Sequence, residues 1–192
     1  MHDYSMRGHP RERLIYYLAA ASFSLVPLVT SLSGWIGVTQ AISTFAVFTL
    51  MFLAFDKFLW RLTWLRRLFG MPNLNGSWMC RGQRLDASGQ VVQEWTAKVR
   101  IKQTWSRIAV CLQTETSTSR SGPASIAKDE GLGFRLLYSY RNDPHPGSPT
   151  MSPHDGTCDL VFDEECRTAK GIYFNDFNRQ TFGRMELNKD EN

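Results

Sequence analysis

Aromatic and polar side chains that could bind a ligand recur at alternate positions in the C-terminal part of this 192-residue chain. Tyr138 and Tyr140 share one face of a predicted strand, and Tyr173 shares a face with Asn175 further along. A face needed only for stability is filled with Leu, Ile and Val, because buried polar groups require hydrogen-bond partners. We therefore expect these faces to line a binding pocket. The alternative is that the tyrosines are ordinary core aromatics with their hydroxyls at the rim.

Four further polar residues could complete such a pocket. Arg120 lies in the Ser/Thr/Gly-rich run 117–122, which we interpret as a donor-rich loop, and Arg179 lies on a turn just before Thr181. Asn142 begins a Pro-rich loop. Guanidinium groups, hydroxyls and amides are the groups that bind anions and polar edges. The alternative is that both arginines are solvated and the run 117–122 is flexible.

Catalytic and metal-binding patterns are weak by comparison. His145, His154 and Asp155 flank the Pro-rich loop, but their spacing matches no common metal motif, and the chain has no nucleophile elbow, P-loop or dinucleotide glycine motif. The four cysteines are widely spaced and form no Cys-x-x-Cys pair: Cys80, Cys111, Cys158 and Cys166. We expect reduced thiols that pack as small hydrophobes, no metal, no cofactor, no catalytic residue and no enzyme activity.

The elements that position the candidate residues alternate with period two from residue 74 onward. In the run 91–103, apolar side chains occupy one face while Lys98, Arg100 and Lys102 occupy the other. Turn signals separate about eight such runs, a pattern typical of a sandwich or barrel, and short connections favour antiparallel pairing. Eight strands can close around one small ligand, and closure removes exposed edges. We predict an all-β C-terminal domain over residues 71–192, an antiparallel β-barrel of about eight strands, with a break at 117–123 before a short strand at 124–127.

An apolar stretch without Asp, Glu, Lys or Arg precedes this domain, over residues 14–55. It is about twice the ~20 residues that cross a bilayer core, and it is interrupted by glycines near 33–37. We therefore predict a transmembrane hairpin over residues 1–70, with helices at about 14–33 and 38–55, a polar lead over 1–10 and a juxtamembrane linker. A signal peptide has a shorter apolar region, and a soluble helical hairpin has a polar face.

Charge separates the two parts of the chain. Residues 1–70 hold seven Lys/Arg against three Asp/Glu, whereas residues 71–192 hold fifteen of each. Because cytoplasmic flanks carry the excess of Lys and Arg, we expect both termini to be cytoplasmic. A neutral C-terminal domain excludes a broadly basic surface for duplex nucleic acid, so any anion must be bound by a few local groups.

This architecture resembles the membrane effectors of bacterial CBASS antiphage systems. The resemblance spans nearly the whole chain and also rests on four segments: 74–78 (LNGSW), 103–108 (QTWSRI), 154–157 (HDGT) and 171–174 (GIYF). It implies a barrel that senses a cyclic dinucleotide made by a partner nucleotidyltransferase. It also implies that the ligand drives oligomerisation, after which the helices disrupt the inner membrane and kill the infected cell.

The resemblance leads us to expect an antiphage effector, multi-pass in the cell inner membrane, with a cyclic dinucleotide, the lipid bilayer and further copies of itself as partners. Chemistry, rather than the resemblance, suggests the ligand-binding residues: tyrosines for the bases, arginines and hydroxyls for the phosphates, and an amide for a base edge. They are Tyr138, Tyr140, Tyr173, Arg120, Arg179, Thr181 and Asn142. The alternatives are a membrane-tethered barrel that binds a lipid or other apolar ligand, and a structural adaptor with a filled barrel.

Overall fold

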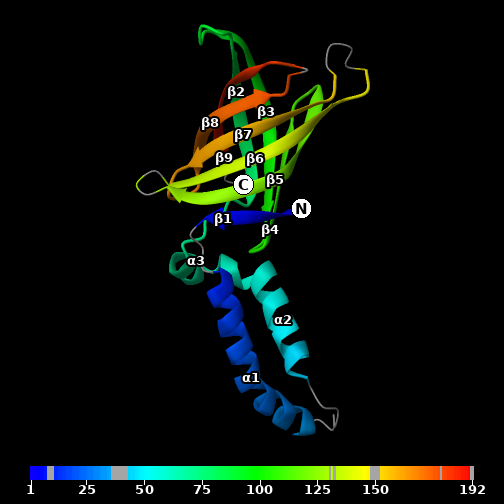
Figure 1. The fold of residues 1–192 in the computed structure, drawn as a ribbon, viewed down its shortest axis with the longest axis vertical. Coiled ribbons are helices and arrows are strands. Elements are labelled where there is room, and N and C mark those ends of the chain that lie inside the picture. The colour runs from blue at the N-terminus through cyan, green and yellow to red at the C-terminus, as the bar shows by residue number, and fades with distance from the viewer. Residues whose placement is uncertain are drawn as a thin grey trace. The chain divides into compact units, whose positions relative to one another are not determined.

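The computed structural model describes residues 1–7, 11–35, 43–129, 131, 133–147, 152–177 and 179–190. Its internal contacts divide the chain into two units, one made of Met1–Gly8 and Met71–Asn192 and the other of His9–Gly70. The first unit is a β-sheet and the second is helical (Figure 1). The helical unit is therefore inserted in the sequence of the β unit.

The described residues form nine strands in one sheet (Figure 1). The strands are β1 (His2–Arg7), β2 (Gly76–Leu85), β3 (Val91–Gln103), β4 (Arg107–Gln113), β5 (Ser117–Asp129), β6 (Gly133–Pro144), β7 (His154–Phe162), β8 (Thr168–Asn175) and β9 (Phe182–Lys189). Their hydrogen-bonded order is β1-β4-β3-β2-β9-β8-β7-β6-β5. Because β5 pairs with both β1 and β4, this order closes on itself.

The N-terminal strand corrects the sequence prediction. The pattern over residues 1–10 predicts a polar lead, but His2–Arg7 forms β1, antiparallel to β4 and parallel to β5. The sheet thus has nine strands rather than about eight, and one of its pairs is parallel. A strand of six residues with a single fully buried apolar side chain, Tyr4, carries too little hydrophobic alternation to be recognised.

Strand β5 is a second correction. The composition of 117–123 predicts a loop, but Ser117–Asp129 is one continuous strand. A register shift between Ser121 and Ala124 accommodates Gly122 and Pro123. Bulges are where a sheet tolerates a proline, because proline cannot donate to the ladder. Side chains on β5 therefore alternate between the two faces of the sheet.

The predicted faces of β3 are confirmed. Ala97, Val99 and Ile101 are buried, and the charged residues between them are exposed. The predicted turn after β2 is also confirmed, since Asp86 Oδ1 accepts hydrogen bonds from the amides of Ser88 and Gln90. Along β2, the packed core lies around Trp78, whose ring contacts Phe162 edge to face at 5.2 Å between centroids.

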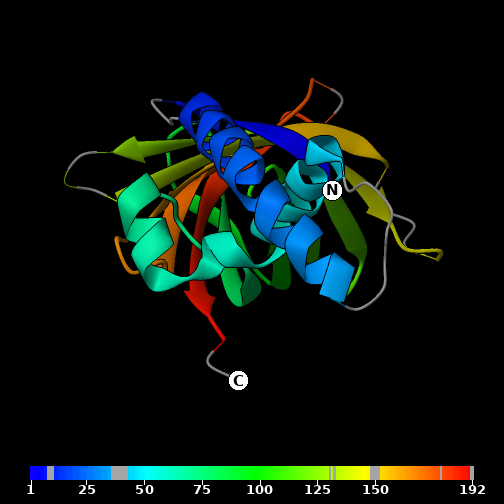
Figure 2. The same ribbon diagram turned by 90° about the horizontal axis from the view of Figure 1, so that it is seen from below.

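The helical unit contains α1 (Arg11–Trp35), α2 (Thr44–Lys57), a 3-10 turn (Leu59–Arg61) and α3 (Thr63–Phe69). Helices α1 and α2 lie side by side (Figures 1 and 2). Within the described residues, one segment is long and apolar enough to cross a membrane, Arg13–Leu32 in α1. The 14 residues of α2 are shorter than a span, and positions 36–42, which hold part of the predicted turn and second helix, lie outside the described residues.

Candidate functional site

Side chains from β2 to β9 line a cavity of about 180 Å³ that is open to solvent. The cavity and the packed core lie at different points along β2. Trp78 belongs to the core, and Arg84, six residues later on the same strand, lines the cavity. Its lining is formed by Arg84, Gln93, Trp95, Val110, Leu112, Thr114, Thr116, Ser117, Ser119, Ser121, Tyr138, Tyr140, Asn142, His154, Tyr173, Asn175, Arg179, Thr181 and Met185.

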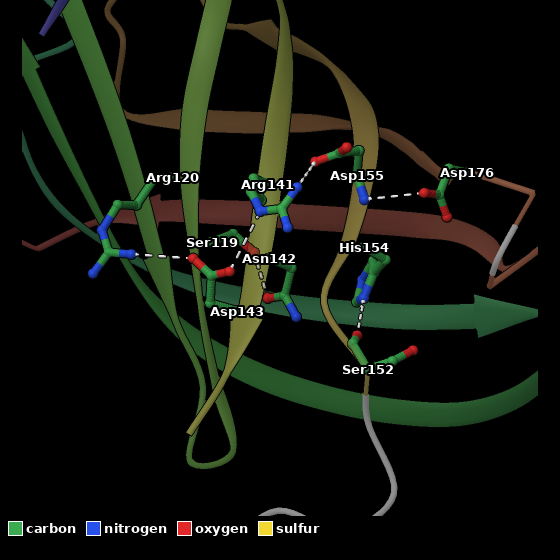
Figure 3. Close-up of polar contacts among 9 residues, drawn as sticks. All are labelled: Ser119, Arg120, Arg141, Asn142, Asp143, Ser152, His154, Asp155 and Asp176. Carbon is green, nitrogen blue, oxygen red and sulfur yellow. Dashed lines mark hydrogen bonds and ion pairs between the residues drawn. The ribbon is translucent and has the colours of Figure 1, made fainter. Parts of the chain in front are cut away.

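Six of the seven residues predicted from the sequence lie in this lining: Tyr138, Tyr140, Asn142, Tyr173, Arg179 and Thr181. The structure does not bring Arg120 to them. Because residue 120 lies in a strand and not in the predicted loop, its side chain points away from Ser119 and Ser121, which line the cavity. Arg120 is 69% exposed and forms an ion pair with Asp143 at 3.3 Å (Figure 3).

Aromatic rings form much of the wall. Trp95 meets Tyr173 edge to face, with 5.7 Å between ring centroids, and its indole N–H donates to the Tyr173 hydroxyl at 3.3 Å. Tyr138 and Tyr140 follow each other along β6, with 6.3 Å between their centroids. These rings offer flat apolar faces next to polar hydroxyls, the combination that suits a planar heteroaromatic ligand.

Inward-facing glycines make room for these rings. A Cβ atom on Gly82 would overlap the Trp95 ring, and one on Gly156 would overlap the Tyr140 ring and the carbonyl oxygen of Phe174. Glycine inside a strand marks a close approach of this kind. The rings therefore lie across the backbone of neighbouring strands, so their orientation is fixed by the sheet itself.

Short polar networks hold the other side chains in place. The Tyr140 hydroxyl donates to Asn175 Oδ1 at 2.7 Å, and Asn175 Nδ2 donates to the hydroxyl of Thr181. On the other side, the Ser119 hydroxyl donates to Asn142 Oδ1 at 2.7 Å (Figure 3). Both networks join residues of different strands, so the lining is organised before a ligand enters.

The charged side chains in the cavity lining are two arginines. Arg84 and Arg179 are half-buried and form no ion pair within the part of the chain that the structure describes, and none of the described lining residues is Asp or Glu. Burial raises the pKa of the Tyr173 hydroxyl, while the Trp95 hydrogen bond and the charges of Arg84 and Arg179 oppose that rise. Burial also raises the pKa of Tyr140. The tyrosines thus stay neutral, and the two guanidinium groups attract anions.

The thiol nearest the cavity, Cys158, is protonated at neutral pH. Burial raises the pKa of Cys158 to about 12, and its sulfur lies 3.4 Å from that of Met185. A protonated thiol is a poor nucleophile. His154 lines the cavity, with its Nδ1 3.0 Å from the carbonyl oxygen of Ser152, whereas Asp155 is 61% exposed and pairs with Arg141 (Figure 3). Across the described residues, no cluster of three or more His, Cys, Asp or Glu could hold a metal.

Two lining residues, Arg84 and Trp95, are absent from the set predicted from the sequence. Strand β2 continues to Leu85, so Arg84 follows Cys80 and Gly82 on the inward face. Trp95 belongs to the apolar face predicted for the run 91–103, which holds no predicted site residue. Gly82 is the signal that could have identified Trp95, because a glycine in an alternating strand leaves space for a large neighbour.

Comparison with known proteins identifies the family of this chain. The family described as "Cap15, cyclic dinucleotide receptor domain" matches residues 69–189, which is more than half of the chain. The chain belongs to the Cap15 family. A Cap15 relative, CD-NTase-associated protein 15 from Yersinia aleksiciae, is 35% identical over 154 residues that cover 80% of this chain and 73% of the relative. Both findings support the resemblance to CBASS effectors, and the Cap15 match contains every residue of the cavity lining but not β1.

Proposed function

We propose that this Cap15-family protein is an antiphage effector that binds a cyclic dinucleotide in the cavity. The observation that carries the proposal is the composition of the lining, in which two arginines that form no ion pair with a described residue stand beside an aromatic wall. A cyclic dinucleotide presents two flat bases and two phosphates. A guanidinium group binds a phosphate through two parallel N–H···O hydrogen bonds. Stacking on an aromatic ring contributes about 1–3 kcal/mol per base.

Each side chain has a role in this proposal. Tyr138, Tyr140 and Tyr173 stack on the bases, and Asn142 reads a base edge. Arg179, with the neighbouring Thr181 hydroxyl, binds a phosphate. Arg84, which also acts on the Tyr173 hydroxyl, joins these phosphate-binding groups. Arg120 is left out because its side chain lies on the outer face of the sheet.

Membrane action completes the proposed function. Helix α1 supplies one apolar segment of spanning length. We propose that residues 38–55, which include most of α2, form a second span, with both termini in the cytoplasm and the hairpin in the inner membrane. A ligand from a partner nucleotidyltransferase raises activity only if it binds the active state better than the resting one. Oligomerisation then concentrates the hairpins and disrupts the bilayer.

The apolar part of the lining supports a second candidate, a membrane-tethered barrel that binds a lipid or other apolar ligand. Val110, Leu112 and Met185 would contact its hydrocarbon. The two arginines separate the candidates, because a neutral lipid gains nothing from two half-buried positive charges, whereas a dinucleotide with two phosphates does.

Calorimetric titration of the full chain in detergent tests the proposal. The probes are 3′,3′-linked cyclic di-AMP, cyclic di-GMP and cyclic GMP–AMP, a cyclic trinucleotide, and linear dinucleotides as the matched control. We expect saturable binding of at least one cyclic probe and much weaker binding of its linear form. Binding of none of them refutes the proposal, and co-purified lipid in the same preparation favours the second candidate.

Topology needs its own measurement. Reporter fusions at the C-terminus and near Trp35 should place the first in the cytoplasm and the second in the periplasm, because Lys and Arg flank the hairpin on both sides. A periplasmic C-terminus is incompatible with the proposal, since a cytoplasmic messenger cannot reach a receptor domain on the other side of the membrane.

A further inference from the structure

The sheet around the cavity has a seam between β4 and β5. These two strands pair directly only from Cys111 opposite Arg120 to Gln113 opposite Thr118. Beyond that point β1 takes the place between them, with two residues opposite β4 and four residues opposite β5. The strands β2 and β3, by contrast, pair along nearly their whole length. The closure of the sheet at the seam therefore depends on a short strand.

A single serine joins the seam to the cavity. The backbone N–H of Val110 on β4 donates to the Ser121 hydroxyl at 2.8 Å. His2 Nε2 on β1 lies 2.8 Å from the same oxygen. Ser121 and Val110 both line the cavity. One hydroxyl group thus bonds to β4, to β1 and faces the space that a ligand would fill.

The size of the cavity makes this seam important. Its volume is about 180 Å³, whereas sites for drug-sized ligands measure roughly 300–1,000 Å³. A cyclic dinucleotide is at least drug-sized, so part of it extends out of the open cavity unless the wall widens around it. Continuous hydrogen-bonded ladders resist separation, and the seam has the shortest ladders in the described sheet. The wall therefore widens most readily where β1 lies.

Strand β1 is short, and its main anchor is Tyr4, whose hydroxyl also lies within reach of Met71 Sδ, the Thr104 carbonyl oxygen and Gln103 Nε2. Tyr4 is buried, and its hydroxyl donates to the carbonyl oxygen of Trp105 at 2.9 Å. The ion pair between Asp3 and Arg107 is exposed, so it contributes little. Only residues 8–10 separate Arg7, the last residue of β1, from Arg11, the first of α1. Any displacement of β1 therefore changes how the chain enters the membrane helix.

We infer that β1 is a releasable strap. A ligand that fills the cavity forms a hydrogen bond with the Ser121 hydroxyl in place of β1 and β4, and the seam opens. Strand β1 is then released, and its release alters the chain segment that leads into α1. The inference rests on the proposed function and adds its regulation. In the ligand-free protein the strap closes the sheet. In the liganded protein β1 leaves the seam, so the unpaired segment that precedes α1 becomes longer by the residues of β1.

A disulfide-trapping experiment on the full chain in detergent tests the strap. Asp3 and Arg107 face each other across β1 and β4, and antiparallel partners have Cα atoms about 4.5–5.5 Å apart, within the range of a disulfide. In D3C/R107C, we measure the rate of cross-linking by a mild oxidant with and without saturating cyclic di-AMP, cyclic di-GMP or cyclic GMP–AMP, whichever binds. D3C and R107C alone are the controls for the native cysteines.

Ligand should slow cross-linking about fivefold or more, the factor that one net hydrogen bond represents. The oxidised variant should bind the same probe more weakly, and a reductant should restore binding. Ser121→Ala should slow cross-linking even without ligand, while Ser125→Ala, on the same strand but outside the cavity lining, should not. Equal rates in a protein that binds the probe overturn the strap and leave the proposed function intact. Failure to bind any probe overturns both.

Discussion

Replacing Arg84 or Arg179 by alanine should weaken ligand binding without weakening the fold. Both guanidinium groups line the cavity, and neither takes part in an ion pair within the described residues. Both charges act on the hydroxyl of the same tyrosine, Tyr173. Removing one of them therefore takes away an anion-binding group without breaking an ion pair between described residues.

The expected loss follows from the surroundings of the arginines. A hydrogen bond to a charged group contributes about 1.5–3 kcal/mol net, which corresponds to about 10- to 150-fold in Kd. The free energy of unfolding of the ligand-free protein should change by less than about 0.5 kcal/mol, the usual range for a site without a packing role. The two effects are thus well separated in size.

Calorimetry and a urea unfolding curve measure the two quantities on the same preparation. Lys98→Ala is the matched control, because it also removes a positive charge but from the exposed face of β3. It should leave both quantities unchanged. Unaltered affinity in Arg84→Ala and Arg179→Ala, or an equal loss in Lys98→Ala, would show that the anion is bound elsewhere.

Three further predictions concern packing, pH and the membrane. Gly156→Ala should displace the Tyr140 ring and destabilise the protein by about 1–3 kcal/mol, as overpacking does. It should also abolish high-affinity binding. A well-folded variant with full affinity would contradict the described packing. Burial raises the pKa of Cys158 from 9.0 to about 12, so between these pH values the unfolded state loses the thiol proton while the native state keeps it. The urea midpoint should therefore not depend on this thiol below about pH 9 and should fall as the pH rises toward 12, with a smaller fall in Cys158→Ala. Leu50→Arg in α2 should cost about 2.5–3.5 kcal/mol of membrane insertion, ending leakage of dye-loaded vesicles while ligand binding persists; leakage by the stable variant would show that α2 is not the disruptive part.

The sequence predicted the strands whose hydrophobic alternation is strong. In β3 and β6 the period of two is regular, so their inward faces, including Tyr138 and Tyr140, could be assigned before the structure. Strand β5 could not be predicted, because Ser, Thr, Gly and Pro are the residues of loops and only pairing with both neighbours makes them a strand. Its misassignment also placed Arg120 on the wrong side of the sheet.

Other parts of the site depend on contacts between distant segments. Arg84 lies on β2 beyond the end of its recognisable alternation, and it reaches the cavity only because β2 pairs with β9 as far as Leu85. The closure of the sheet by β1 depends on residues about a hundred positions away on β4 and β5. No local pattern in a six-residue polar segment encodes such pairing, so the sequence alone did not reveal it.

The insertion of the helical unit between β1 and β2 has a practical consequence for anyone who wishes to isolate the sheet. A fragment cut at the family match, residues 69–189, lacks β1 and exposes the unpaired edges of β4 and β5, which invite aggregation. A fragment that keeps the whole sheet needs residues 1–8 joined to residue 71 by a short Gly/Ser linker in place of the helical unit, since both segments belong to one unit. By the same connectivity, a protease that cuts once at residues 8–10 leaves the helices attached through Gly70, so complete separation of the two units takes two cuts.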